Sequence, residues 1–148
     1  RMDYLGEKLS HATVMRRIWE RLGDDRMFQF GIRSGLREEF IWARTHTHLY
    51  PFNLDKLEGS VPLFKDRPLY VTVDLDVLDP AVFPGTGTPE PGGVSFQELL
   101  HALCALRGLH IVGADVVELS PHYDNSGVST AVACKVVREL ALTMSTFS

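Results

Sequence analysis

The segment from Leu109 to Val117 is an almost continuous run of apolar residues, and it restricts the possible folds more than any other part of the chain. Such a run is typical of a β-strand that is covered on both faces, as in a parallel sheet between helices. Further strands are expected at Met27–Ile32 and at Leu69–Val73, where the second enters a long loop. These segments predict a parallel sheet.

Segments with the spacing of amphipathic helices alternate with these strands. Ser10–Leu22 places apolar residues close to the helical period and ends before Gly23, a residue type that often stops helices. Ser95 and Glu98 form a capping-box pattern ahead of another periodic apolar run. Further helices are expected at Leu36–Ala43 and Val128–Met144. The alternation predicts an α/β fold, whose ligands usually bind where strands end and loops begin.

Charge and composition argue against several classes of partner. The formal net charge is -4 over 148 residues and basic residues are mixed with acidic ones, so no nucleic-acid-binding surface is expected. No apolar run approaches the roughly 20 residues that cross a bilayer, and the N-terminus lacks a secretory signal pattern. We therefore expect no membrane association and a cytoplasmic location. Cys104 and Cys134 lie in predicted helices and are expected to be buried free thiols.

Two carboxylates follow the strand that begins at Leu69. Residues i and i+2 of a strand share a face, so Asp74 and Asp76 are expected to project together from its carboxyl end. Neighbouring carboxylates repel, and cations that prefer oxygen ligands relieve that repulsion. A lone Asp-x-Asp also occurs in solvated turns and caps, so the pair alone leaves both interpretations open.

The loop that starts at Asp79 and runs to Gly93 contains four of the eight prolines and four of the twelve glycines of the chain. Proline restricts φ and glycine permits conformations closed to other residues, so together they specify a rigid path. This loop is a candidate wall of a binding site. The Asp79 carboxylate is expected to hydrogen-bond the loop backbone rather than to bind a metal.

Three motifs resemble the ureohydrolases, the family of the arginases and agmatinases. They are DLDVLDP followed by PGTGTPEPGG (residues 74–80 and 84–93), GADVVELSP (113–121) and SHAT (10–13). The resemblance spans essentially the whole chain. It implies a three-layer αβα fold with a mainly parallel sheet, and it makes Asp74 and Asp76 ligands of a two-manganese centre that activates the attacking water.

The same resemblance suggests roles for three more residues. Glu118 matches the glutamate that receives the substrate, because a carboxylate accepts the planar guanidinium fork in bidentate fashion. His11 matches the histidine that passes a proton to the leaving amine, as an imidazole that titrates near neutrality can do. Thr88 matches a threonine near the substrate. The alternatives are a surface glutamate, a cap or surface histidine, and a purely structural turn threonine.

The pair His46 and His48 matches no family motif. Two imidazoles at this spacing would share one face of a strand, but a solvated loop is the favoured interpretation.

The loop and SHAT motifs look more like those of agmatinases than those of arginases. The expected reaction is therefore hydrolysis of agmatine to putrescine and urea by a homo-oligomer. Other guanidino substrates, as in arginases or guanidinobutyrases, and a non-catalytic ureohydrolase-like subunit that binds a partner are the alternatives.

Two further metal-binding motifs of complete ureohydrolases, a segment that ends in Asp-His and an Asp-Ala-His-x-Asp run, do not occur in this sequence. Residues 1–148 are therefore expected to form the C-terminal part of one ureohydrolase domain. A chain of this extent should be inactive alone and expose a strand edge.

Overall fold

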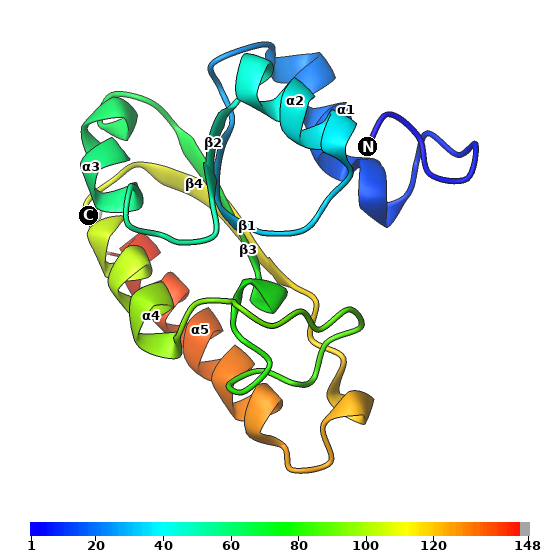
Figure 1. The fold of residues 1–148 in the computed structure, drawn as a ribbon. Coiled ribbons are helices and arrows are strands. Elements are labelled where there is room, and N and C mark those ends of the chain that lie inside the picture. Colours follow the sequence, from blue (N-terminus) through cyan, green and yellow to red (C-terminus); the bar gives the residue numbers. More distant parts are fainter. Residues whose placement is uncertain (146–148) are drawn as a thin grey trace. The chain divides into compact units, whose positions relative to one another are not determined.

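The computed structural model describes residues 1–145. The chain forms two compact units, Arg1–Pro51 and the remainder from Phe52 onward. Each unit contains one pair of parallel strands with helices beside it (Figure 1). The predicted α/β fold with parallel strands is confirmed, and the assignment of both units to a single domain stays a prediction.

The first unit is built on strands β1 (Phe28–Ile32) and β2 (His48–Pro51). Aromatic pairs across the two strands stabilise this sheet, because Phe30 and Tyr50 stack with ring centroids 5.0 Å apart. Its remaining elements are η1 (His11–Thr13), α1 (Val14–Leu22) and α2 (Arg37–His46). Helix α1 ends at Gly23 as expected, because Gly23 takes a φ of 78° that residues with side chains rarely adopt.

The interpretation of His46 and His48 as a solvated loop was wrong. His46 ends α2 and His48 begins β2, and both side chains are half-buried. His46 Nδ1 lies 2.9 Å from Asp24 Oδ1, and the His48 ring stacks on Phe28 with centroids 4.1 Å apart. The two imidazoles lie on different elements and do not share a strand face.

The second unit is built on strands β3 (Leu69–Asp74) and β4 (Ile111–Val117). The predicted capping box at Ser95 is present, since Glu98 N–H donates to Ser95 Oγ (3.2 Å) and Ser95 N–H donates to Glu98 Oε2 (2.7 Å). The other elements of this unit are α3 (Leu57–Ser60), η2 (Val61–Phe64), η3 (Leu75–Val77), α4 (Phe96–Ala105), η4 (Pro121–Tyr123) and α5 (Val128–Ser145).

The core of the second unit lies between its sheet and the neighbouring helices α4 and α5 (Figure 1). Phe83 from the loop after β3 is fully buried in this core, and burial of a side chain of that size contributes roughly 1.5–3 kcal/mol. The core residues include Val73, Leu75, Leu78, Phe83, Leu99, Leu103, Val136 and Leu140. The loop is therefore anchored from within by an apolar side chain.

Strand β4 is less covered than its apolar sequence indicated. Val112 is 57% exposed and Val117 is 41% exposed, although Ile111 is buried. Helices α4 and α5 pack on the face that carries Ala114 and Val116, so within the described residues the expected burial of both faces is wrong.

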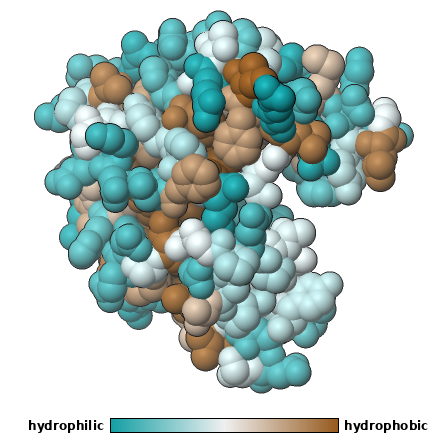
Figure 2. All heavy atoms as spheres, in the orientation of Figure 1, coloured by the Kyte–Doolittle hydropathy of each residue, from teal (hydrophilic) through white to brown (hydrophobic). Residues whose placement is uncertain are grey.

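Two further expectations concern the burial of the cysteines and bilayer-spanning segments. Cys104 on α4 is half-buried and Cys134 on α5 is exposed; both thiols are free, so full burial was wrong for Cys134 in particular. Among residues 1–145, no helix combines the length and apolarity that a bilayer span requires. Figure 2 shows apolar side chains scattered among hydrophilic ones on the visible face, and Leu5 and Leu9 are 89% and 84% exposed.

Candidate active site at the carboxyl ends of β3 and β4

The last residue of β3 and the residue after β4 bring two carboxylates to one edge of the sheet. Asp74 pairs with Val117 in the parallel register, so Glu118 follows directly beside it. Glu118 has a φ of 71°, in the left-handed region that a residue with a side chain rarely adopts. Such backbone strain gathers at functional sites, and it is an independent reason to place Glu118 in one.

Asp76 reaches this edge by a different route from the predicted one. It lies in the 3₁₀ turn η3 and not on β3, because the Asp74 carboxylate accepts the Asp76 N–H over 3.1 Å and turns the chain. The argument from strand periodicity was therefore wrong for Asp76. The two carboxylates are nevertheless close enough to interact electrostatically.

The neighbouring negative charges affect the pKa of Asp74. Partial loss of hydration, followed by the charge of Asp76 and more weakly that of Glu118, raises the pKa of Asp74 to about 7. Asp74 keeps accessible surface, but surrounding protein replaces much of the water around its carboxylate. A nearby cation would favour the charged form of Asp74.

The chemistry of these donors fits part of a manganese site. Carboxylate oxygens are hard ligands, and Asp74 and Asp76 present them side by side. Residues 1–145 contain no group of three or more His, Cys, Asp or Glu side chains arranged to hold a metal ion. The two aspartates would therefore supply only part of such a coordination sphere.

The predicted role of Asp79 in shaping the loop is confirmed. Asp79 Oδ1 accepts the N–H of Ala81 (2.9 Å), and Oδ2 accepts the N–H groups of Gly92 (2.8 Å) and Gly93 (3.2 Å). Gly93 also packs against the backbone, since a Cβ there would lie 2.5 Å from Asp79 N. One carboxylate therefore closes the two ends of the loop onto each other, and we call residues 79–93 the substrate loop.

Two threonines of the substrate loop have opposite environments. Thr88, the predicted substrate residue, is exposed. Thr86 is 2% exposed, and its buried Oγ1 has no hydrogen-bond partner among the described residues. Sequence reasoning could not distinguish the two threonines, because burial of Thr86 depends on contacts made by the folded loop.

His11 lies in the first unit, directly after Ser10 at the start of η1. Its side chain is exposed, and its ring meets the Tyr4 ring edge-on with centroids 5.1 Å apart. The carboxylates belong to the second unit, so the participation of His11 in the site stays a prediction.

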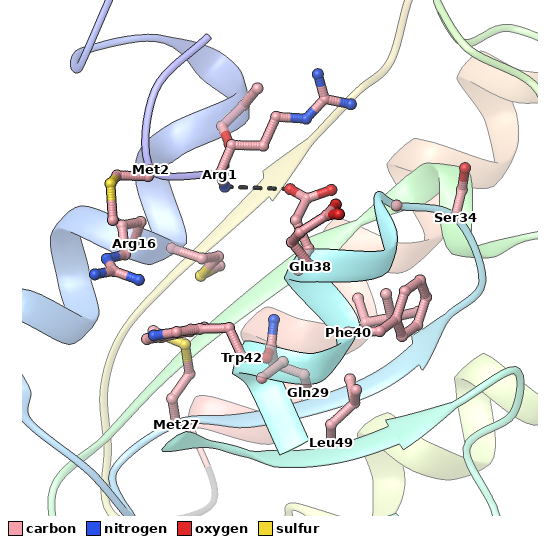
Figure 3. Close-up of a pocket in the computed structure, with 16 residues that line it drawn as sticks. Arg1, Met2, Arg16, Met27, Gln29, Ser34, Glu38, Phe40, Trp42 and Leu49 are labelled. Atoms are coloured by element: carbon pink, nitrogen blue, oxygen red, sulfur yellow. Dashed lines mark hydrogen bonds and ion pairs between the residues drawn. The ribbon is translucent and has the colours of Figure 1, made fainter. Parts of the chain in front are cut away.

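The first unit also contains an apolar pocket of about 430 Å³ that sequence reasoning missed. Figure 3 shows Phe40 and Trp42 of α2, Leu49 of β2 and Met27, the residue before β1, on its walls. The Arg1 amino group pairs with Glu39 over 3.3 Å beside it. None of the predicted site residues lines this pocket.

Residues 1–143 match the sequence model of the arginase family. The chain belongs to the arginase family. An agmatinase from Bacillus anthracis is 46% identical over 146 residues, and the match covers 96% of this chain and 50% of that protein. The mitochondrial arginase of Medicago truncatula is 38% identical, with 97% of this chain and 44% of that protein covered.

Solved structures show the same fold. A putative agmatinase from Clostridium difficile superposes with a TM-score of 0.94 at 50% sequence identity, over 98% of this chain and 54% of that one. The chain spans about half the length of the curated relatives it matches. Its arginase-like fold is therefore that of half of such a protein.

Proposed function

We propose that the enzyme formed with this chain hydrolyses a guanidino group and releases urea, and that agmatine is its substrate. The observation that carries the proposal is the meeting of Asp74, Asp76 and Glu118 at the carboxyl ends of β3 and β4. Agmatinases of three Bacillus species, 44–46% identical to this chain, support the choice of substrate.

The three carboxylates have different proposed roles. Asp74 and Asp76 would hold manganese, which supplies the activation of the attacking water when it is bound. Glu118, strained and exposed at the strand end, accepts the N–H donors of the guanidinium group. Thr88, which is exposed in the substrate loop, would contact the same substrate.

The reaction requires one proton transfer by a side chain. Water adds its oxygen to the guanidinium carbon, the bond between that carbon and the alkyl nitrogen breaks, and the carbon leaves as urea. The proton that the water loses balances the one that the alkyl nitrogen takes up as it becomes an amino group of putrescine. We assign that proton transfer to His11, whose side chain is exposed and whose imidazole is a common general acid in enzymes. We further propose that the enzyme is a cytoplasmic homo-oligomer that binds neither nucleic acid nor membranes.

A chimaera tests this function directly. The part of the Bacillus subtilis agmatinase outside its match is fused ahead of Arg1 to supply the length that this chain does not span. With Mn²⁺, the chimaera is expected to release urea and putrescine from agmatine, and the chain without the fusion is expected to release none. Arginine and 4-guanidinobutyrate are assayed in parallel and should be poorer substrates.

Glu118→Gln provides the control within the site. It keeps the shape of the side chain and removes the charge that pairs with the guanidinium, so kcat/KM should fall by about 100-fold or more. Manganese content should not change. A chimaera that folds and binds manganese but releases no urea from any of the three compounds would refute the proposal and favour a non-catalytic binding role.

A further inference from the structure

The substrate loop is attached to the second unit at its middle as well as at its ends. The N–H of Gly85 donates to Ser129 Oγ over 2.8 Å, and the Gly85 carbonyl accepts the N–H of Ser120 over 2.8 Å. Ser129 lies in the first turn of α5, and Ser120 is two residues after Glu118. Gly85 therefore joins three segments that lie side by side (Figure 1).

The contact at Gly85 leaves no room for a side chain. A Cβ there would lie 2.7 Å from Ser129 Cβ and 3.1 Å from Asp124 Cβ. Gly87 stands two residues later in the same loop, and a Cβ at Gly87 would meet nothing within 4 Å. Neither glycine has a positive φ, so the effect of an alanine at each position depends on the space around its Cβ and not on backbone strain. The two glycines form a matched pair for substitution.

Ser129 is held in place by its own neighbours. Its side chain is fully buried, and its N–H donates to Asp124 Oδ2 over 2.7 Å. Asp124 Oδ1 accepts both the N–H (3.0 Å) and the hydroxyl (2.5 Å) of Ser126. A continuous series of hydrogen bonds thus runs from the start of α5 through Ser129 to the substrate loop, and from Gly85 to the segment after Glu118.

We propose that Ser129 is a positioning residue for substrate recognition. Through its hydrogen bond to Gly85, Ser129 fixes the position of the substrate loop relative to Glu118 and the segment that follows it. Thr88 and the Glu118 carboxylate then face the same guanidino substrate. A side chain that buried hydrogen bonds already hold in its binding position loses less conformational freedom when the substrate binds. This assignment rests on the proposed function for the roles of Thr88 and Glu118, and on hydrogen-bond geometry for the link between their segments.

Hydrogen exchange on the 148-residue chain tests the link without any assay of activity. Ser129→Ala removes only the hydroxyl that accepts from Gly85. The amides of Gly85 and Ser120 should both exchange about tenfold faster, because local opening then requires fewer broken contacts. Gly87→Ala should leave both rates unchanged. If Ser129→Ala accelerates Gly85 alone and Ser120 keeps its rate, the proposed link is absent and the inference is overturned.

Kinetics of the chimaera test the consequence for substrate. Ser129→Ala should raise KM for agmatine about tenfold, with a smaller effect on kcat per bound manganese. Gly85→Ala should act in the same direction and more strongly, and Gly87→Ala should have little effect. If Gly85→Ala does not fold, Ser129→Ala alone decides.

An unchanged KM with less folded enzyme would show a merely structural role for Ser129 and overturn the inference. Failure of the unsubstituted chimaera to release urea would instead contradict the proposed function, and the exchange rates would then decide whether Ser129 links the two segments.

Discussion

Glu118 combines a left-handed backbone with an exposed carboxylate at the end of β4. That conformation has a steric free-energy cost for residues with a Cβ, but not for glycine. Glycine would fit the backbone at Glu118 better, and this strain favours a role for the Glu118 carboxylate. The structure therefore adds a physical argument to the motif resemblance that first indicated this residue.

Glu118→Gly separates the two contributions. The free energy of unfolding of the chain should stay constant or rise by up to about 1 kcal/mol, because backbone strain is relieved. The same change in the chimaera should abolish urea release. Thermal denaturation and a urea assay measure the two effects, and a marked loss of stability would show that Glu118 is retained for the fold.

Asp79→Asn tests how the substrate loop is closed. One carboxylate oxygen becomes an NH2 group that cannot accept a hydrogen bond. Either the N–H of Ala81 or those of Gly92 and Gly93 then lose their acceptor, so the free energy of unfolding should fall by about 1 kcal/mol. Asp55→Asn, at an exposed aspartate in the same unit, should change it little. Equal effects of the two substitutions in chemical denaturation would contradict the role of Asp79.

The secondary elements were largely predictable because their signals are local. Apolar periodicity placed α1, β3 and α5, and the Ser95 pattern placed the start of α4. The turn at Asp76 was missed because a side-chain cap from Asp74 produces it, and apolar spacing carries no record of that bond. The Gly85–Ser129 contact was also missed, because it joins residues 44 apart whose approach depends on the packing of α5.

The start of α5 gives the fold a defined response to acid. Hydrogen bonds from the Ser126 hydroxyl, and then from Ser129, hold the pKa of Asp124 below its ordinary value of 3.8. A lowered pKa in the folded state means that the charged carboxylate stabilises the fold above about pH 4. That contribution declines as the pH falls below this value.

Asp124→Asn should therefore lower stability at pH 7 and have a progressively smaller effect as the pH falls below about 4. Thermal denaturation between pH 2 and 7, with the exposed Asp66→Asn as the control, measures the difference. A destabilisation by Asp124→Asn that does not vary with pH would contradict the role of its charge.

Two structural features of the chain favour its association with a partner. Each sheet within the described residues has only two strands, which is marginal for independent stability. Helix α1 also leaves apolar side chains in solvent, with Val14 49%, Ile18 38% and Leu22 55% exposed. Exposed apolar stripes of this kind favour association.

The chain alone is therefore expected to self-associate, and the chimaera should form a defined oligomer. Leu22→Lys should reduce association of the chain without loss of the helix, because a cation near a helix C-terminus is favourable. Thr45→Lys, at an exposed position of α2, is the control. Sedimentation velocity over a range of concentrations measures both, and a monomeric unsubstituted chain at every concentration would contradict the expectation.

We expect Asp74 and Asp76 at the carboxyl end of β3 to hold manganese beside Glu118. A crystal structure of the chimaera grown with Mn²⁺, with anomalous data collected at the manganese edge, tests this expectation. Anomalous peaks should lie within about 2.0–2.4 Å of carboxylate oxygens of both aspartates. Strong manganese peaks elsewhere, with Asp74 and Asp76 pointing into solvent and no cation near them, would contradict it.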